Sequence, residues 1–154
     1  MRELLQLLTA CIGALGFALL YNTRGINVLF AAVGGLLGWA AFLGAGVLWG
    51  PNDYIGGFAA SVMLTVYAEC MARIRKTPVT VFLVCGAIPL VPGAALYRAM
   101  KYLTAGNIQM FREQSAYALL FAASMSAGIM VTTIIFRLCW SFIAKDVKEK
   151  RRRI

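Results

Sequence analysis

Most charged residues of this chain cluster in four short stretches, and long apolar segments fill the intervals between them. The charged stretches are residues 22–27, 73–76, 98–112 and 145–153. A helix needs roughly 20 apolar residues to cross the ~30 Å hydrocarbon core of a bilayer, and four or five such segments fit into 154 residues. Because a helix satisfies its own backbone hydrogen bonds where lipid cannot, the pattern predicts an all-α integral membrane protein, a bundle of about five transmembrane helices.

The apolar segments set the expected bounds of these helices within a single transmembrane domain, residues 1–154. We expect helices at approximately 4–21, 28–49, 55–73, 78–100 and 116–144, followed by a basic cytoplasmic tail at 145–154. The first segment has the length of a membrane helix and lacks the small-x-small site that ends a cleavable signal peptide. We therefore expect it to be a membrane helix.

The distribution of lysine and arginine predicts the orientation of the bundle. The connections after the first and third helices, together with the tail, hold ten of these residues, whereas the opposite side holds four: Arg2, Arg98, Lys101 and Arg112. Basic loops stay in the cytoplasm, so we expect the N-terminus outside and the C-terminus inside. The basic tail is expected to attract anionic lipids, which accounts for much of the net charge of +9 without nucleic acid as a partner.

The composition argues against an enzyme. The chain has no histidine, which removes the commonest metal ligand and the usual general base. Its four cysteines stand singly in apolar segments, without the spacing of a metal or redox site, and are expected to pack as small hydrophobic side chains. We therefore expect no catalytic residue, no metal site and no cofactor.

The second apolar segment is rich in glycine. Gly34 and Gly38 form a GxxxG pattern, which Ala40 and Gly44 extend. Small residues at this spacing let two membrane helices approach closely. The stripe therefore predicts a packing face.

Two prolines and a glycine interrupt the fourth apolar segment near its middle. Pro89 and Pro92 each lack an N–H and clash with the carbonyl four residues earlier, so the carbonyls of Cys85 and Ile88 lose their helical donors. Gly93 permits a sharp change of direction. These features predict a helix broken at 89–93, with one half from 78 to about 88 and a second from about 93.

The predicted break is a candidate binding site, because unwound backbone at bilayer depth is tolerated only where it is buried in protein or lines a cavity. In transporters, half-helix N-termini at such breaks face anionic groups and freed carbonyls face cations. A small zwitterion matches that pair of ends, so we predict a substrate-binding site at Pro89, Pro92, Gly93, Ala94 and Tyr97. A proline-kinked helix with a structural role is the alternative.

Glu69 is the only carboxylate well inside an apolar segment. Ionisable residues in membrane helices are candidates for proton or ion coupling, which is the first interpretation of Glu69. Arg73 follows four residues later, at the spacing of a helical ion pair. The second interpretation is therefore a structural partner for Arg73.

Two strings of this sequence resemble the threonine/serine exporter (ThrE) family, in particular its short small-subunit type: KTPVTVFLVCGAIPLVPGAALYRAM (Lys76–Met100) and ALGFALLYN (Ala14–Asn22). The most specific part is the P-x-x-P-G string with the tyrosine after it. The family motif therefore matches Pro89, Pro92, Gly93 and Tyr97 position by position. The resemblance extends over nearly the whole chain in length, spacing and helix order.

The resemblance implies a subunit of a secondary transporter in the cytoplasmic membrane of a bacterium, acting with a larger membrane subunit. Members of the family export threonine and serine, and paired subunits are implicated in exporting a dicarboxylate such as succinate. One intramembrane acid and no deep arginine suit a zwitterion better than a dianion, so a threonine/serine-type substrate is favoured. Dicarboxylate export, a structural or assembly subunit without its own site, and a homo-oligomer stay open as alternatives.

Overall fold

The computed structural model describes residues 2–152, with side chains from residue 3 to residue 140. This part of the chain is helical throughout apart from short connections and holds no strand. In chain order the elements are α1 (Arg2–Leu20), α2 (Asn27–Trp49), α3 (Asp53–Arg75), α4 (Val79–Ala87), the 3-10 helix η1 (Ile88–Leu90), α5 (Gly93–Thr104) and α6 (Ile108–Arg152). The expected all-α architecture is confirmed.

Four of these helices, α1, α2, α3 and α6, are each long and apolar enough to cross a bilayer. A fifth span requires two pieces, because α4 with η1 and α5 pass the same test only together and are bent by 52° at the link between them. The expected count of about five spans and the expected interruption of the fourth are both confirmed.

Local signals in the connections explain where the helices begin and end. The Asn52 side chain accepts hydrogen bonds from the backbone N–H groups of Tyr54 (3.1 Å) and Ile55 (3.4 Å), which caps the start of α3. At the other end of α3, Lys76 adopts a left-handed conformation with φ 52°. Pro78 then precedes α4 with an extended backbone, as the fixed proline φ allows before a helix.

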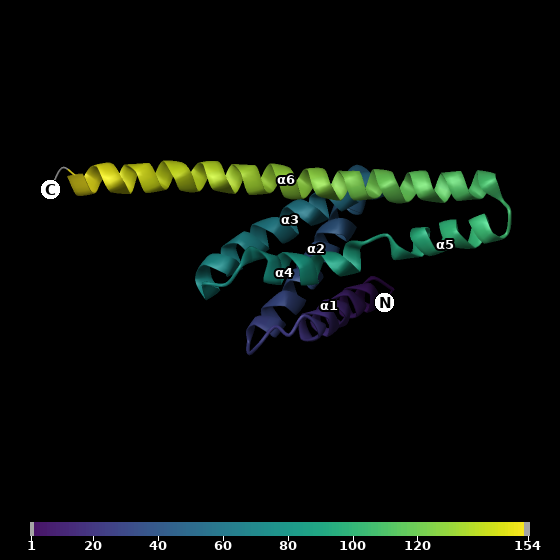
Figure 1. Ribbon diagram of the computed structural model, residues 1–154, viewed down its shortest axis with the longest axis horizontal. Helices are drawn as coiled ribbons and strands as arrows, with labels where there is room; N and C mark the ends of the chain where they lie inside the picture. Colours follow the sequence, from purple (N-terminus) through teal and green to yellow (C-terminus); the bar gives the residue numbers. More distant parts are fainter. Residues whose placement is uncertain (1, 153–154) are drawn as a thin grey trace.

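The helix α3 lies at the centre of the bundle, between α2, α4 and α6. It runs in the same direction as α6, because Gly57 faces Phe121, Ser61 faces Gly128 and Arg73 lies over Trp140. Figure 1 shows α6 passing along one side of the molecule, with α3 beside its middle part. The α3–α6 contact thus places the middle of α6 alongside the other spans.

The connections after α1 and after α3 lie at the same end of the bundle. The Arg75 side chain donates a hydrogen bond from Nε to Asn27 Oδ1 at 2.9 Å, which ties the end of α3 to the start of α2. This end carries Arg24, Arg75 and Lys76, and we call it the basic end. The connection at 50–52, between α2 and α3, lies at the opposite end.

The last helix is longer than the expected 116–144. It begins at Ile108 and contains 45 residues, which at 1.5 Å per residue is about 67 Å, twice the thickness of a bilayer core. The polar residues before 116 join the helix because Asn107 Oδ1 accepts the N–H of Met110 at 3.1 Å, an N-terminal cap. The polar residues before 116 are therefore part of α6 and do not mark its start.

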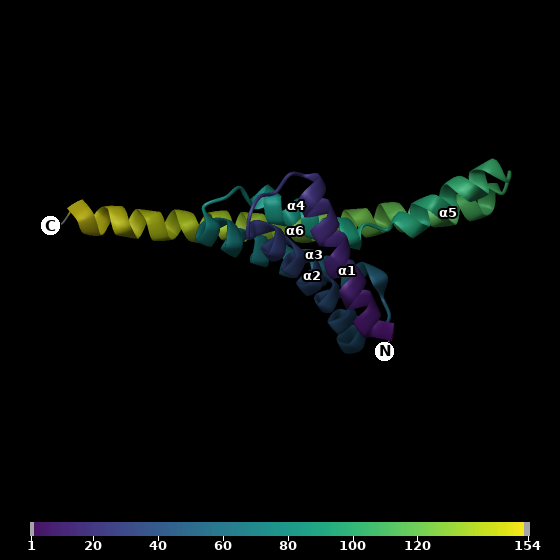
Figure 2. The ribbon, with the colours of Figure 1, turned by 90° about the horizontal axis from the view of Figure 1, so that it is seen from below.

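The additional length of α6 is covered on one side by α5. These two helices pack together, with Arg98 Nε donating to Gln114 Oε1 at 3.1 Å, and they extend away from the other helices (Figures 1 and 2). At its other end the α6 backbone continues into the expected tail as far as Arg152. The basic side chains of that tail, Lys145–Arg153, lie outside the side chains that the structure describes.

Candidate functional site

The break between α4 and α5 has the geometry of two half-helices with a short link. The α-helix ends at Ala87, and Ile88–Leu90 form a single 3-10 turn. Val91 is extended, with ψ 132°, because the following proline disfavours a helical conformation there. Pro92 then precedes the start of α5 at Gly93. The chain therefore changes direction within four residues.

The link satisfies part of its own hydrogen bonding. The Ile88 carbonyl accepts the N–H of Val91 at 3.1 Å, and the Gly93 N–H donates to the Val91 carbonyl at 2.7 Å. The Ala95 N–H donates to the Pro92 carbonyl at 3.1 Å. The Ile88 carbonyl, which was expected to lose its helical donor, and the Gly93 N–H at the start of α5 thus both have partners within the chain.

Glycines on α1 and α2 leave room for the Pro89 ring at the break. The Pro89 ring lies 3.8 Å from the position that a Cβ would take at either Gly13 of α1 or Gly35 of α2. Gly86 packs on the backbone of α2, where an added Cβ would be 3.3 Å from the Gly35 nitrogen. Gly38 of the predicted stripe also packs against the break, since an added Cβ would lie 3.2 Å from the Leu90 side chain, whereas nothing lies within 4 Å of one at Gly44. Only part of the stripe is therefore a packing face, and its contact with the break was not indicated by the sequence pattern.

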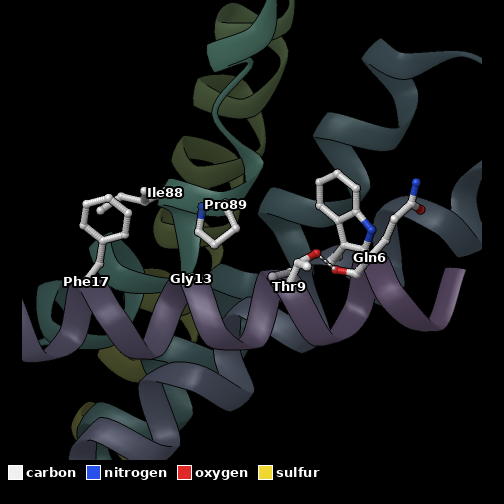
Figure 3. Close-up of a pocket in the computed structure, with 8 residues that line it drawn as sticks. Gln6, Thr9, Gly13, Phe17, Ile88 and Pro89 are labelled. Carbon is white, nitrogen blue, oxygen red and sulfur yellow. Dashed lines mark hydrogen bonds between the residues drawn. The ribbon is translucent and has the colours of Figure 1, made fainter. Parts of the chain in front are cut away.

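A pocket of about 290 Å³ lies between α1, α2 and the break (Figure 3). Its lining residues come from three elements: Gln6, Thr9, Ala10, Gly13 and Phe17 of α1, Trp39 of α2, and Ile88 and Pro89 of η1. None of them is ionisable. The pocket is thus mostly apolar with a few polar groups, as is usual for sites that bind small molecules.

Three side chains give this break pocket its polar character. The Thr9 hydroxyl donates to the backbone carbonyl of Gln6 at 2.9 Å, and its lone pairs can still accept another hydrogen bond. The Gln6 amide carries both donors and an acceptor. The indole Nε1–H of Trp39 is buried and has no acceptor among the described protein groups, and a buried donor in this state costs about 1–3 kcal/mol unless something accepts from it.

Gln6, Thr9 and Trp39 were not expected at the site from the sequence. A usable signal was present for Gln6 and Thr9, since they are polar residues three apart and therefore on one face of a membrane helix. For Trp39 the sequence offers only its place in the middle of an apolar segment. Which helix it faces depends on how α1, α2 and the break pack together.

Of the predicted binding residues, only Pro89 lines the break pocket. Pro92 is half-buried in the link, and Gly93 and Ala94 are exposed at the start of α5. Tyr97 is 72% exposed and lies on α5, which leads away from the bundle. The bend at the break therefore separates these residues from Pro89, whereas a straight helix would have kept them together.

Glu69 lies on α3 and is buried, with 8% of its surface exposed. Its Oε2 is 2.6 Å from Arg73 Nη1, which also donates to the Glu69 carbonyl at 2.7 Å. The Arg73 guanidinium in turn lies over the rings of Phe136 and Trp140 of α6. The carboxylate thus has the ion-pair partner that its spacing indicated and does not line the break pocket.

Comparison with known proteins finds one family model. It carries the description "Threonine/Serine exporter, ThrE" and matches residues 6–135. This range contains all the spanning elements except the start of α1 and the end of α6, and it includes every residue that lines the break pocket. No curated protein and no solved structure matches the chain.

Proposed function

The chain belongs to the threonine/serine exporter family, and from this premise we propose that it is a membrane subunit of a secondary transporter that exports threonine- or serine-type amino acids. The family is one of membrane transporters and not of enzymes. The observation that carries the substrate proposal is the break pocket, which Pro89 and Trp39 both line and in which the indole N–H of Trp39 is buried without a partner among the described residues.

The chemistry of the pocket suits a small hydroxylated zwitterion. A carboxylate or hydroxyl oxygen of the substrate would accept from Trp39 Nε1–H once the indole turns to expose this buried group to the pocket. The side-chain amide of Gln6 would pair with either a donor or an acceptor. A volume of about 290 Å³ suits a ligand of this size. Since no lysine or arginine lines the pocket, its walls offer no fixed charge to the second carboxylate of a dicarboxylate.

Trp39→Phe tests this proposal, because it removes the N–H and keeps an aromatic ring that can stack on Phe42, whose centroid is 5.3 Å away. We expect the threonine concentration for half-maximal export to rise about tenfold, since a lost hydrogen bond of ~1.4 kcal/mol corresponds to that factor. Export assays over a range of intracellular threonine concentrations measure it. Trp49→Phe is the matched control, because Trp49 is 65% exposed and remote from the pocket.

An unchanged half-maximal concentration in Trp39→Phe contradicts binding at this pocket. Competition by succinate instead of serine, measured in the same assay, would favour the dicarboxylate alternative. If neither threonine nor succinate is exported and the larger subunit still assembles with this chain, the result favours a structural or assembly role for the chain.

We propose further that the protein lies in the cytoplasmic membrane of a bacterium and acts with a larger membrane subunit. Several apolar side chains of α1 are exposed and need lipid or another membrane protein to cover them, which supports both parts of this proposal. They are Leu4, Leu5, Leu8, Ile12 and Leu19. The basic end, where Arg75 contacts Asn27, would face the cytoplasm under the positive-inside rule. The C-terminus would then be cytoplasmic, and the basic tail would meet anionic lipids.

Glu69 is our candidate for coupling export to a proton or ion gradient, with its ion pair to Arg73 as the competing role. We expect Glu69→Gln to abolish uphill export while exchange of threonine across the membrane survives, because the amide cannot gain or lose a proton. Transport in membrane vesicles with and without an imposed gradient separates the two activities. Uphill export at the parental rate would assign Glu69 to the ion pair alone.

A further inference from the structure

A second pocket opens between α1 and α4, nearer the basic end. Its volume is about 240 Å³, and it is lined by Tyr21 and Thr23 after α1 and by Thr80, Val81, Val84 and Cys85 of α4. Three hydroxyl groups and a thiol contribute to its walls, and no lysine, arginine or carboxylate does. We call it the basic-end pocket. The function proposed above does not use it.

The two pockets lie end to end along one seam, the contact line between α1 and α4. Phe17 lines the break pocket and Tyr21 the basic-end pocket, four residues later on α1. On the opposite wall, Val84 of α4 lines the basic-end pocket and Ile88, four residues later, lines the break pocket. Residues four apart share a helix face about one turn, ~5.4 Å, from each other, so the second pocket continues the first toward the basic end.

Two apolar side chains stand where the pockets meet. Figure 3 shows the Phe17 ring and Ile88 together at the end of the break pocket that is farther from Gln6. From Phe17, α1 continues toward Tyr21 and the basic-end pocket. The Phe17 ring is half-buried and is held by its contacts with neighbouring side chains alone, because phenylalanine has no hydrogen-bonding group. A ring of this kind can swing aside without breaking a polar interaction.

We propose that the basic-end pocket is a second binding position for the same small hydroxylated amino acid, and that Phe17 and Ile88 form the partition between the two positions. This inference rests on the proposed function and extends it from one pocket to a path along the α1–α4 seam. The hydroxyls of Tyr21, Thr23 and Thr80 both donate and accept hydrogen bonds, so they match the ammonium, carboxylate and hydroxyl of such a substrate without fixed charge.

Protection of introduced thiols tests the second position. The native cysteines are first replaced by serine, and Val84→Cys or Thr9→Cys then places a single thiol in the basic-end or the break pocket. Membranes containing the complete exporter are treated with 2-aminoethyl methanethiosulfonate, with and without L-threonine. At about ten times the dissociation constant, threonine leaves roughly a tenth of the sites free, so we expect about tenfold slower modification of both thiols.

The pattern of protection separates this inference from the proposed function. Thr104→Cys, on an exposed residue at the polar end of α5 that lines neither pocket, is the matched control, and its modification rate is expected to be the same with and without threonine. Protection of Thr9→Cys alone overturns the second position and leaves the proposed function intact. Protection of neither pocket thiol contradicts the proposed function as well. Protection of Val84→Cys alone supports the second position and moves the substrate away from the break pocket.

Phe17→Ala tests the partition with a different readout. Removing the ring joins the two pockets, so we expect threonine to run down its gradient several-fold faster in vesicles without an energy source. Leu19→Ala, on an exposed residue of the same helix that lines neither pocket, is the control. A leak rate equal to that of Leu19→Ala overturns the role of Phe17 as a partition, whatever the thiol experiment shows.

Discussion

Replacing Pro89 and Pro92 together by alanine is expected to reduce threonine export to the level of cells without the protein, while the helical bundle still forms. Alanine is about 3 kcal/mol more favourable than proline inside a helix, and its N–H restores the donors to the Cys85 and Ile88 carbonyls. The 52° bend is therefore expected to straighten. In a straight helix, the residue at position 89 would move away from Gly13 and Gly35, and the break pocket would lose one of its walls.

Export and folding are measured side by side for this double variant. Helix content by circular dichroism in detergent should equal or exceed that of the parent, because a helix becomes longer and no packed side chain larger than a proline ring is removed. Pro51→Ala is the matched control, since Pro51 lies exposed in the connection between α2 and α3 and its replacement should leave export unchanged. Full export by Pro89→Ala/Pro92→Ala would exclude the break as the substrate site and favour a structural or assembly subunit.

The largest loss of stability is expected from a single added methyl group at Gly128→Ala. A Cβ at this position would lie 2.9 Å from the Phe58 carbonyl oxygen and would also overlap the Ser61 hydroxyl. The hydroxyl can rotate away, but the backbone carbonyl cannot, so α6 must move off α3. Overpacking of this kind costs typically 1–3 kcal/mol, and in a membrane such close helix contacts supply much of the association energy.

The protein is heated in detergent to a series of temperatures, and size-exclusion chromatography then measures the folded fraction that remains at each. The temperature at which half remains is the midpoint. We expect a lower midpoint and a smaller folded fraction for Gly128→Ala. Gly44→Ala is the matched control, because nothing lies within 4 Å of the Cβ that it would add to α2. Its helix propensity improves by up to ~1 kcal/mol, so the midpoint should stay or rise. Equal midpoints for the two variants would contradict the close α3–α6 contact.

Features set by neighbouring residues could be predicted from the sequence more closely than features set by contacts between distant residues. The helix from 55 to 73 was expected within two residues of its observed bounds at each end, because Asn52 and Lys76 stop it locally. The start of the last helix was expected eight residues too late, since polar residues were taken to interrupt it. They do not, because Asn107 caps a helix that begins at Ile108 and packs against α5.

The candidate site likewise contains a residue that the sequence predicts and others that it does not. Pro89 was identified from its own chemistry, which removes a hydrogen bond wherever the residue stands in a helix. Tyr97 was expected in the binding site beside Pro89, and the structure leaves it 72% exposed on α5. Gln6 and Trp39 were not identified, because they are 83 and 50 residues from Pro89 in sequence and meet it only through helix packing.

The sequence by itself determined the long apolar spans, their number and the interruption of the fourth, because these follow from the length of a bilayer crossing and from the missing proline N–H groups. Tertiary structure alone decided which helices cross at the break, and so which residues line the pocket beside it. The reason is physical: glycines at positions 13, 35 and 86 bring three helices into contact. A sequence shows that such helices can approach closely, but not which partner each one meets.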